Sequence, residues 1–492
     1  MALNICLVNP PIREWTRPNV PPLGLLLLSS VLRQAGHTVT IYDINGHRFS
    51  REQVETWASS ARYDLYGVTG MITQWNYIRW LTETIRRHQS KAVIVAGGPV
   101  VSNCPDLFAQ RMTAVDALVV GEGERAVLDV CRDVERRKLQ GSCEATVSTQ
   151  PVDAKTRTGL VLQKVATNKP VYQADNIEDL DEIPFPDYEN LDTTSIYLGN
   201  PVGAMNVRKW IDGNPIPGQE IRNLCLLSTR SCVFRCRFCQ PRYLGEAPRI
   251  RSSKNIADEI ERLVTMRGVK YVHFCDELTF FSKKMATAFS EELIKRGLHK
   301  QITWGVPARI DVLDRPSMER MRESGCILLG LGVESLSETV LKAMDKFGTL
   351  AGGVEKVVEN IRIAREIIPV VGTAFIVGYP GETRESIQET IRNMQRIGPD
   401  FRPTDATYAT PYPGTWLWDY AVKQGHIKDP IPYIERINEN ARKMIINFTD
   451  IPFDELRIWK RRLECATFDE VPPPRPDGSV DEFLGIEYSY PH

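Results

Sequence analysis

Two stretches of this 492-residue chain alternate short apolar runs with amphipathic segments, and this alternation limits the fold more than any other feature. In the first stretch, residues 3 to about 135, the apolar runs have the length of strands, and helical patterns such as 24–34 and 78–88 separate them. The runs cover residues 4–8, 38–42, 66–70, 92–96 and 117–120. Strands that alternate with helices predict a parallel sheet with helices on both faces. We therefore expect an N-terminal doubly wound α/β domain.

Glycines gather at the predicted carboxyl ends of these strands, where open parallel sheets bind ligands. They are Gly70, Gly97, Gly98, Gly121 and Gly123. The run Gly121-x-Gly123-x-x-Ala126 loosely matches a dinucleotide fingerprint. That fingerprint belongs after the first strand, however, with an acidic residue at the end of the next one. Here it follows the fifth strand, and a plain strand-to-helix turn is an equally good interpretation.

The second stretch repeats the alternation of strand and helix patterns, and it predicts a sheet that curls into a partial barrel. Its apolar runs cover residues 223–230, 270–275, 302–306, 326–332, 373–378 and 405–410. Six such βα units fit a partial barrel, in which functional residues lie at the carboxyl ends of the strands.

Three cysteines follow the first of these strands in the spacing C-x3-C-x2-C. They are Cys232, Cys236 and Cys239. Three thiolates at this spacing can hold three irons of a cubane cluster, whereas a closed zinc site takes four ligands. The fourth iron would stay open to a substrate or cofactor. A partial zinc knuckle or a chance cluster is the simpler alternative.

This cysteine run, with the aromatic Phe238 before its last member, resembles the signature of the radical S-adenosylmethionine (SAM) superfamily. The resemblance implies that the open iron of a [4Fe-4S] cluster chelates SAM. Electron transfer from a donor such as flavodoxin or ferredoxin then releases a 5′-deoxyadenosyl radical. It also implies SAM-binding residues in the cysteine loop and at the strand ends. They are Phe238, Asp276, Glu277, Arg309, Glu334, Ser335 and Gly378. The polar ones at the strand ends have an alternative role as helix caps or, for Arg309, in a surface ion pair.

The first stretch resembles the cobalamin-binding domain that precedes many radical SAM domains. The resemblance is carried by Pro21-Pro-Leu-Gly24, Ala96-Gly-Gly-Pro99 and Val120-Gly-Glu-Gly-Glu124. It implies that cobalamin contacts Gly70, Gly97, Gly98, Pro99, Gly121, Glu122, Gly123 and Glu124. Where related domains place a cobalt-ligating histidine, this chain has Asn45, and His47 is out of register. We therefore expect cobalamin to bind without a histidine on cobalt, with His47 at the surface.

These predictions divide the chain into four parts. Residues 1–137 form the cobalamin-binding domain, 138–222 a linker and insertion, and 223–425 the partial (β/α)6 radical SAM barrel. Residues 426–492 form a small, mostly helical extension, with amphipathic patterns at 433–443 and 453–465.

Charge and composition exclude several classes of protein. Lys plus Arg and Asp plus Glu number 61 and 62, so no global basic field favours a nucleic acid partner. No apolar run reaches the roughly 18 residues of a membrane span. The first eight residues lack the basic region of a signal peptide. Eleven cysteines without a regular framework fit a reducing, cytoplasmic compartment better than a disulfide scaffold.

The function predicted from these resemblances is a cobalamin-dependent radical SAM enzyme acting on a small molecule. The implied reaction is methylation of an unactivated carbon, with methylcobalamin as methyl donor and the 5′-deoxyadenosyl radical as hydrogen abstractor. An oxidative cyclase or a ring-rearranging enzyme is the alternative within the class. A tRNA methylthiotransferase fits less well, because Cys6, Cys104 and Cys131 are scattered in the first domain. A non-catalytic cobalamin or redox sensor is the alternative from another class.

Overall fold

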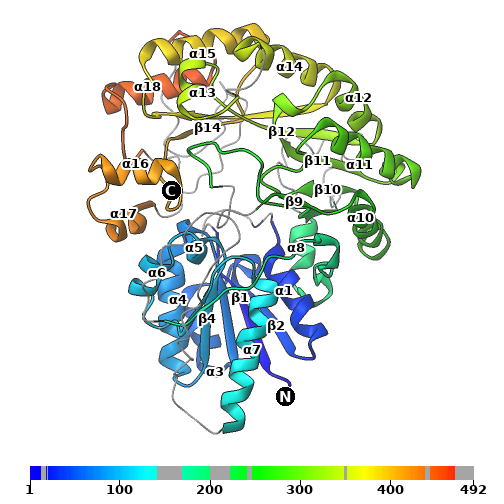
Figure 1. Ribbon diagram of the computed structural model, residues 1–492, viewed down its shortest axis with the longest axis vertical. Coiled ribbons are helices and arrows are strands. Elements are labelled where there is room, and N and C mark those ends of the chain that lie inside the picture. Colours follow the sequence, from blue (N-terminus) through cyan, green and yellow to red (C-terminus); the bar gives the residue numbers. More distant parts are fainter. Residues whose placement is uncertain are drawn as a thin grey trace.

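A computed structural model of the chain contains two parallel sheets, one in each half of the molecule (Figure 1). It describes residues 1–12, 18, 20–140, 169–199, 222–240, 247–347, 352–437 and 444–470. In Figure 1 the N-terminal sheet stands below and the second sheet lies above it. Helices of the C-terminal part return to the side of the N-terminal half.

The first sheet has six strands in the order β2-β1-β3-β4-β5-β6, all parallel. Their bounds are β1 Asn4–Asn9, β2 Thr38–Asp43, β3 Leu65–Thr69, β4 Val93–Gly97, β5 Ala117–Val119 and β6 Val171–Tyr172. Helices cover both faces, namely α1 Leu23–Gln34, α2 Ile44–His47, α3 Arg51–Ser60, α4 Trp75–His88, α5 Pro99–Ser102, α6 Pro105–Arg111 and α7 Gly123–Gln140. The predicted doubly wound domain is confirmed.

Strand β1 shows why its run is apolar throughout. Ile5 and Leu7 belong to the core that α1 and α7 cover, whereas Cys6 and Val8 belong to the core under α3, α4 and α6. Successive side chains of a strand point to opposite faces, so a strand covered on both faces needs apolar residues at every position.

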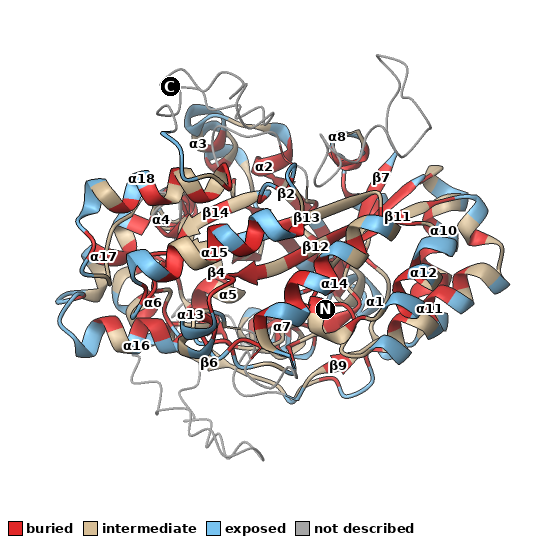
Figure 2. Cartoon of the chain, turned by 90° about the horizontal axis from the view of Figure 1, so that it is seen from above, coloured by how far each residue is buried: buried red, intermediate tan, exposed pale blue. Residues whose placement is uncertain are grey.

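The second sheet also has six parallel strands, and its neighbours follow chain order. The strands are β7 Asn223–Leu226, β10 Tyr271–Phe274, β11 Thr303–Ala308, β12 Cys326–Glu334, β13 Val370–Val377 and β14 Asp405–Tyr408. Helices between them cover one face, namely α10 Ser253–Arg267, α11 Lys283–Lys295, α12 Arg315–Glu323, α13 Glu338–Ala343, α14 Gly353–Ile367 and α15 Arg384–Ile397. The sheet is an open half-barrel, as predicted. Figure 2 shows buried residues along its strands and exposed residues on the outer helices.

The run predicted as one strand over residues 223–230 is broken in the structure. β7 ends at Leu226, and the chain resumes as β8 (Thr229–Arg230), which pairs antiparallel with β9 (Arg249–Ile250). The buried carboxylate of Asp276 accepts hydrogen bonds from the backbone N–H groups of Ser228 and Thr229, at 2.7 and 3.0 Å. These bonds turn the chain out of the sheet just before the cysteines.

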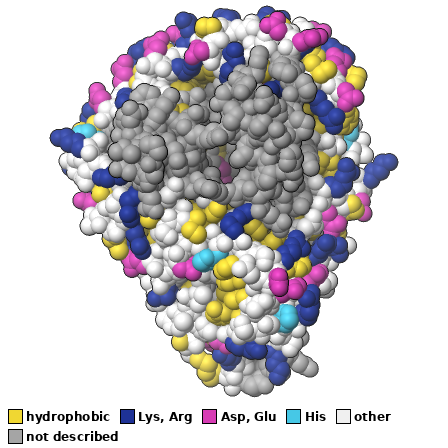
Figure 3. All heavy atoms as spheres, turned by 180° about the vertical axis from the view of Figure 1, so that it is seen from behind, with side chains coloured by type: hydrophobic (Ala, Val, Ile, Leu, Met, Phe, Trp, Pro, Cys, Tyr) yellow, Lys and Arg dark blue, Asp and Glu magenta, His cyan; other side chains and the backbone are white. Residues whose placement is uncertain are grey.

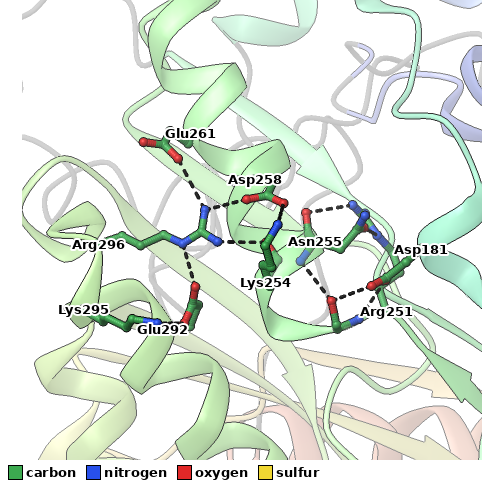
Figure 4. Close-up of polar contacts among 10 residues, drawn as sticks. Asp181, Arg251, Lys254, Asn255, Asp258, Glu261, Glu292, Lys295 and Arg296 are labelled. Atoms are coloured by element: carbon green, nitrogen blue, oxygen red, sulfur yellow. Dashed lines mark hydrogen bonds and ion pairs between the residues drawn. The ribbon is translucent and has the colours of Figure 1, made fainter.

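The segment between the domains is tied to both of them. Strand β6 adds an edge to the first sheet, and the Tyr188 hydroxyl donates to the carbonyl of Cys225 in β7 at 2.8 Å. Asp181 accepts from the backbone N–H of Ser252, at the start of α10, at 2.9 Å. Figure 4 shows Asp181 beside Arg251 and Asn255 at the start of α10, and next to them a separate group of charged residues around Arg296, at the end of α11.

The C-terminal part closes the other side of the molecule. Helices α16 (Trp416–Lys423) and α17 (Pro430–Ile437) pack onto the first domain, and α18 (Phe453–Glu464) packs against α15 and β14. Glu435 pairs with Arg79 at 2.6 Å and with Arg111 at 2.9 Å, both in the first domain. The helical extension was predicted, whereas its contact with the first domain was not. Residues 438–443 lie outside the described part.

No helix in the described part of the chain is long and apolar enough to cross a membrane.

Replacing Trp304 by Ala should lower the free energy of unfolding of the half-barrel by about 3–5 kcal/mol, because a cavity is left in a packed core. Trp304 is fully buried, and its ring lies 5.3 Å from that of Phe289. Denaturant unfolding measures the change. The control is Trp416→Ala, at a side chain that is 42% exposed, which should cost about 1 kcal/mol or less. Equal costs at the two positions would contradict the described core.

Candidate active site

A cavity of about 340 Å³ lies between the two domains. The first domain contributes Leu7 of β1, the carboxyl ends of β3, β4 and β5, and residues of the helices α1, α5 and α7. The second domain contributes the residues around the start of the cysteine loop. Its lining includes Thr69, Gly97, Gly98, Pro99, Gly121, Glu122, Gly123 and Glu124 from the first domain, and Thr229, Arg230, Ser231, Cys275 and Glu277 from the second.

One end of the cavity is an apolar slot between the first sheet and its helices α1 and α7. It is lined by Leu7, Leu25, Leu28, Leu65, Val95, Val119, Val127 and Val130. Glycines keep this slot open, because a Cβ on Gly67 would lie 2.8 Å from Leu7 Cδ2 and one on Gly123 3.2 Å from Leu28 Cδ2. An apolar slot that opens into a polar mouth would hold part of a large cofactor such as cobalamin, with the rest of it extending from the mouth. Gly70 is absent from the lining, since its Cβ position faces Ile78 and Gln74.

Asn45 and the nearby Asp43 do not line the cavity. Asp43 is buried and accepts from Asn9 at 2.7 Å and from the Tyr197 hydroxyl at 2.8 Å. Asn45 donates to the same hydroxyl at 3.4 Å. The side chains of Asp43 and Asn45 are therefore both bonded to Tyr197 of α8 (Thr194–Leu198). His47 pairs at the surface with Asp192, at 2.9 Å.

The three cysteines share one loop directly after β8. Ser231 turns the chain into the loop with a left-handed backbone, φ 67°, and Cys232 and Cys236 are each only 8% exposed. Cys239 donates its backbone N–H to the carbonyl of Cys236 at 3.1 Å. Among the described residues, no three His, Cys, Asp or Glu side chains are gathered closely enough to hold a metal ion. The loop therefore offers three neighbouring thiols, and iron itself would draw them into coordination.

Arg309, at the end of β11, contacts the cysteine loop instead of standing at the surface. Its guanidinium is stacked over the ring of Phe234, 3.6 Å from the centroid, and donates to Cys236 Sγ at 3.4 Å. Asp311 accepts two further bonds from it, at 3.0 and 2.7 Å. Arg309 therefore places a buried positive charge in direct contact with the loop that carries the three thiols.

A second buried cation, Lys346, stands on another side of the loop. It donates to Glu334 at 2.9 Å, and its ammonium lies 5.6 Å from the ring centroid of Phe238. Glu334 itself holds a left-handed backbone, φ 67°, at the end of β12. Lys346 thus joins two predicted SAM-binding residues. No sequence pattern indicated Lys346, because it follows β12 by twelve positions and belongs to no strand end.

Adjacent acidic residues at the end of β10 have different surroundings. Asp276 uses its oxygens on Ser228, Thr229 and Thr279, so they are committed to the protein itself. Glu277 faces the cavity, and it is the only predicted SAM-binding residue among the described lining. Burial, reinforced by the charge of Asp276, raises the pKa of Glu277 to about 7.

The other two predicted SAM-binding residues organise strand ends. The Ser335 hydroxyl lies 3.1 Å from that of Thr390 in α15. Gly378, at φ 84°, donates its backbone N–H to Glu382 at 2.5 Å. Sequence reasoning assigned no role to Glu382, although it is 5% exposed and burial raises its pKa to about 8.

Comparison with known proteins places two family models on this chain. The model of the radical SAM superfamily matches residues 226–394, and that of the B12-binding domain matches residues 16–130.

Relatives of the whole chain carry more than one activity. An uncharacterized methyltransferase of Pyrococcus horikoshii is 26% identical, over 91% of this chain and 92% of its own. The anaerobic magnesium-protoporphyrin IX monomethyl ester cyclase of Rubrivivax gelatinosus is 28% identical, over 88% of this chain and 76% of its own.

Among solved structures, the fold resembles TsrM of Kitasatospora setae, a radical SAM methyltransferase determined with cobalamin and a [4Fe-4S] cluster. The TM-score is 0.61 at 17% identity, and the match covers 86% of this chain and 78% of that one.

Because Glu382 has a pKa of about 8 in the folded protein against about 4.5 ordinarily, the folded state binds the extra proton between these values. The stability that it contributes is complete below about pH 4.5 and is lost as the pH rises toward 8. The free energy of unfolding should therefore fall over this window in the wild type and fall less in Glu382→Gln. Glu355→Gln, at an exposed residue, should keep the wild-type slope. Parallel slopes in all three proteins would show that Glu382 is ionised in the fold.

Proposed function

We propose, from the premise that this chain belongs to the radical SAM superfamily and carries a B12-binding domain, that it is a cobalamin-dependent enzyme which methylates an unactivated carbon of a small molecule. The observation that carries this proposal is the single cavity lined both by the strand ends of the B12-binding domain and by the residues that start the cysteine loop.

In such an enzyme SAM bound at the cluster supplies a 5′-deoxyadenosyl radical, and cobalamin supplies the methyl group. The chain's own residues hold and shield these groups. Cys232, Cys236 and Cys239 would ligate three irons of the cluster, with Arg309 donating a hydrogen bond to the sulfur of Cys236. The glycines at the end of β4 and after β5 would allow a corrin ring to approach the backbone.

Glu277 and Glu334 are the carboxylates that we assign to SAM. Glu277 faces the cavity, and Lys346 fixes Glu334 beside the cysteine loop. Asp276, Arg309, Ser335 and Gly378 would support the site through the contacts that hold the loop and the strand ends, because their polar groups already have partners in the protein.

A radical cyclase is the second candidate, because one relative over most of the chain is a magnesium-protoporphyrin cyclase. It would use the same cluster loop and the same cavity. The two candidates differ in one product, since methyl loading from SAM leaves S-adenosylhomocysteine and cyclisation does not.

Partners follow from the same proposal. A small-molecule substrate and a reductant of the flavodoxin or ferredoxin class are needed, in a reducing compartment such as the cytoplasm. On the face drawn in Figure 3, Lys and Arg side chains are interspersed with Asp and Glu over the described surface. This mixture of charges gives no support to a nucleic acid partner.

Product analysis tests the proposal. Protein reconstituted anaerobically with iron, sulfide and cobalamin, then supplied with SAM and a reductant, should form both 5′-deoxyadenosine and S-adenosylhomocysteine by mass spectrometry. Cys232→Ala should abolish 5′-deoxyadenosine while cobalamin stays bound, since most of the cavity lining belongs to the other domain and Cys232 is not part of it. Cys465→Ala, at a buried cysteine outside the loop, is the control. Deoxyadenosine alone from the wild type would favour the cyclase, and neither product would favour a sensor.

Gly98→Ala should weaken the binding of cobalamin at least tenfold in an absorbance titration. Gly98 has φ 78°, and a Cβ there would overlap the hydroxyl of Thr69 at the rim of the cavity. Gly36→Ala is a matched control, because Gly36 also has a positive φ, 88°, but nothing within 4 Å of its Cβ position. An equal loss of affinity in both variants would mean that general destabilisation, and not the cavity rim, is responsible.

A further inference from the structure

The stem of the cysteine loop, which is the ribbon of β8 and β9 at its base, places two arginines directly opposite each other. In the antiparallel ribbon of β8 and β9, Arg230 is in register with Arg249. Side chains of opposed residues share one face of such a ribbon and lie close together, so like charges there destabilise the pairing. The stem of this loop therefore needs negative charge against that face in order to close.

The other domain supplies this charge. Glu122 Oε1 accepts from Arg249 Nη2 at 2.7 Å and lies 3.2 Å from Arg230 Nη1. Glu124 Oε2 accepts from Arg230 Nη1 at 3.1 Å, and its other oxygen accepts a shorter bond from Nη2. One carboxylate thus bridges the two arginines, and the other completes the pairing of Arg230.

These four side chains are well shielded from solvent. The exposed fractions are 9% and 7% for Glu122 and Glu124, and 21% and 8% for Arg230 and Arg249. Ile177 of the interdomain segment adds two bonds, from its N–H to Glu122 at 3.2 Å and from Arg249 to its carbonyl at 2.7 Å. Buried ion pairs stabilise a single arrangement only when their hydrogen bonds are satisfied in this way, and removing one partner leaves a buried charge.

Glu122 and Glu124 belong to a short turn, residues 121–124, which also faces the cavity. Gly121 and Gly123 alternate with the two glutamates and line the cavity together with Arg230 and Ser231. Gly121 has φ 82° and donates its backbone N–H to Ser102 at 3.0 Å. A conformational change of residues 121–124 on the cavity side therefore alters the contacts of the β8–β9 ribbon, which holds the cysteine loop.

We propose that Glu122 and Glu124 couple the two cofactor sites. Filling of the cavity by cobalamin fixes the 121–124 turn, and the fixed turn closes the β8–β9 ribbon under the cysteine loop. The inference rests on the proposed function and deepens it. The two glutamates are then positioning residues, which act through Arg230 and Arg249. Because linkage is reciprocal, assembly of the cluster also tightens the binding of cobalamin.

The affinity for hydroxocobalamin tests this coupling without any turnover. Its Kd is measured anaerobically for cluster-free protein and for protein reconstituted with iron and sulfide, with iron content confirmed. In the wild type we expect the reconstituted form to bind about fivefold or more tightly than the cluster-free form, the lower end of typical coupling. In Glu122→Gln and Glu124→Gln both forms should still bind hydroxocobalamin, but the ratio should approach one.

Two further variants separate coupling from loss of stability. Glu435→Gln removes the ion pairs with Arg79 and Arg111 on the opposite side of the interface and should keep the wild-type ratio. Arg249→Lys keeps the positive charge but loses the two-pronged contact with Glu122, and should give an intermediate ratio. Equal Kd values for the two wild-type forms, or a wild-type ratio in Glu122→Gln and Glu124→Gln, would overturn the coupling alone. A wild type that binds no hydroxocobalamin would overturn the proposed function as well.

Discussion

The arrangement of this protein depends on ion pairs that hold two sheet ends against one cavity. A parallel sheet offers its binding site at the carboxyl ends of its strands, so two such sheets share a site only when those ends meet. Here carboxylates of the first domain pair with arginines of the second on one side, and Glu435 pairs with Arg79 and Arg111 on the other. Charged contacts of this kind have fixed geometry, which apolar packing alone does not give.

This constraint explains the uneven use of polar side chains around the cavity. In the first domain the slot between the sheet and helices α1 and α7 is apolar, with glycines where backbone must come close. Near the second domain two buried cations, Arg309 and Lys346, flank the cysteine loop, and each is neutralised by a carboxylate. The charged side chains of the cavity wall itself are Glu122, Glu124, Arg230 and Glu277, at the mouth where the two domains meet.

The sequence predicted both sheets because short, mostly apolar strand runs alternate along the chain with amphipathic helix patterns. It predicted the cysteine loop because its three thiols are neighbours in the chain. Features that depend on contacts between residues far apart in the chain could not be predicted. The break after Leu226 is made by Asp276, 48 positions beyond Ser228, and β6 is too short to show a pattern. Glu122 and Glu124 were expected to contact cobalamin, and nothing in the sequence indicated that Arg230 and Arg249 would pair with them.

The contact between Glu435 and the first domain has a consequence for synthesis of the chain. Glu435 lies 324 positions after Arg111, yet α16 and α17 cover apolar residues of the first domain. At typical rates of translation the ribosome needs roughly 16 to 65 s to make that intervening length. The first domain can fold early, but during this interval the apolar residues that α16 and α17 later cover stay exposed to solvent. A chaperone that holds nascent chains would be needed most during this interval.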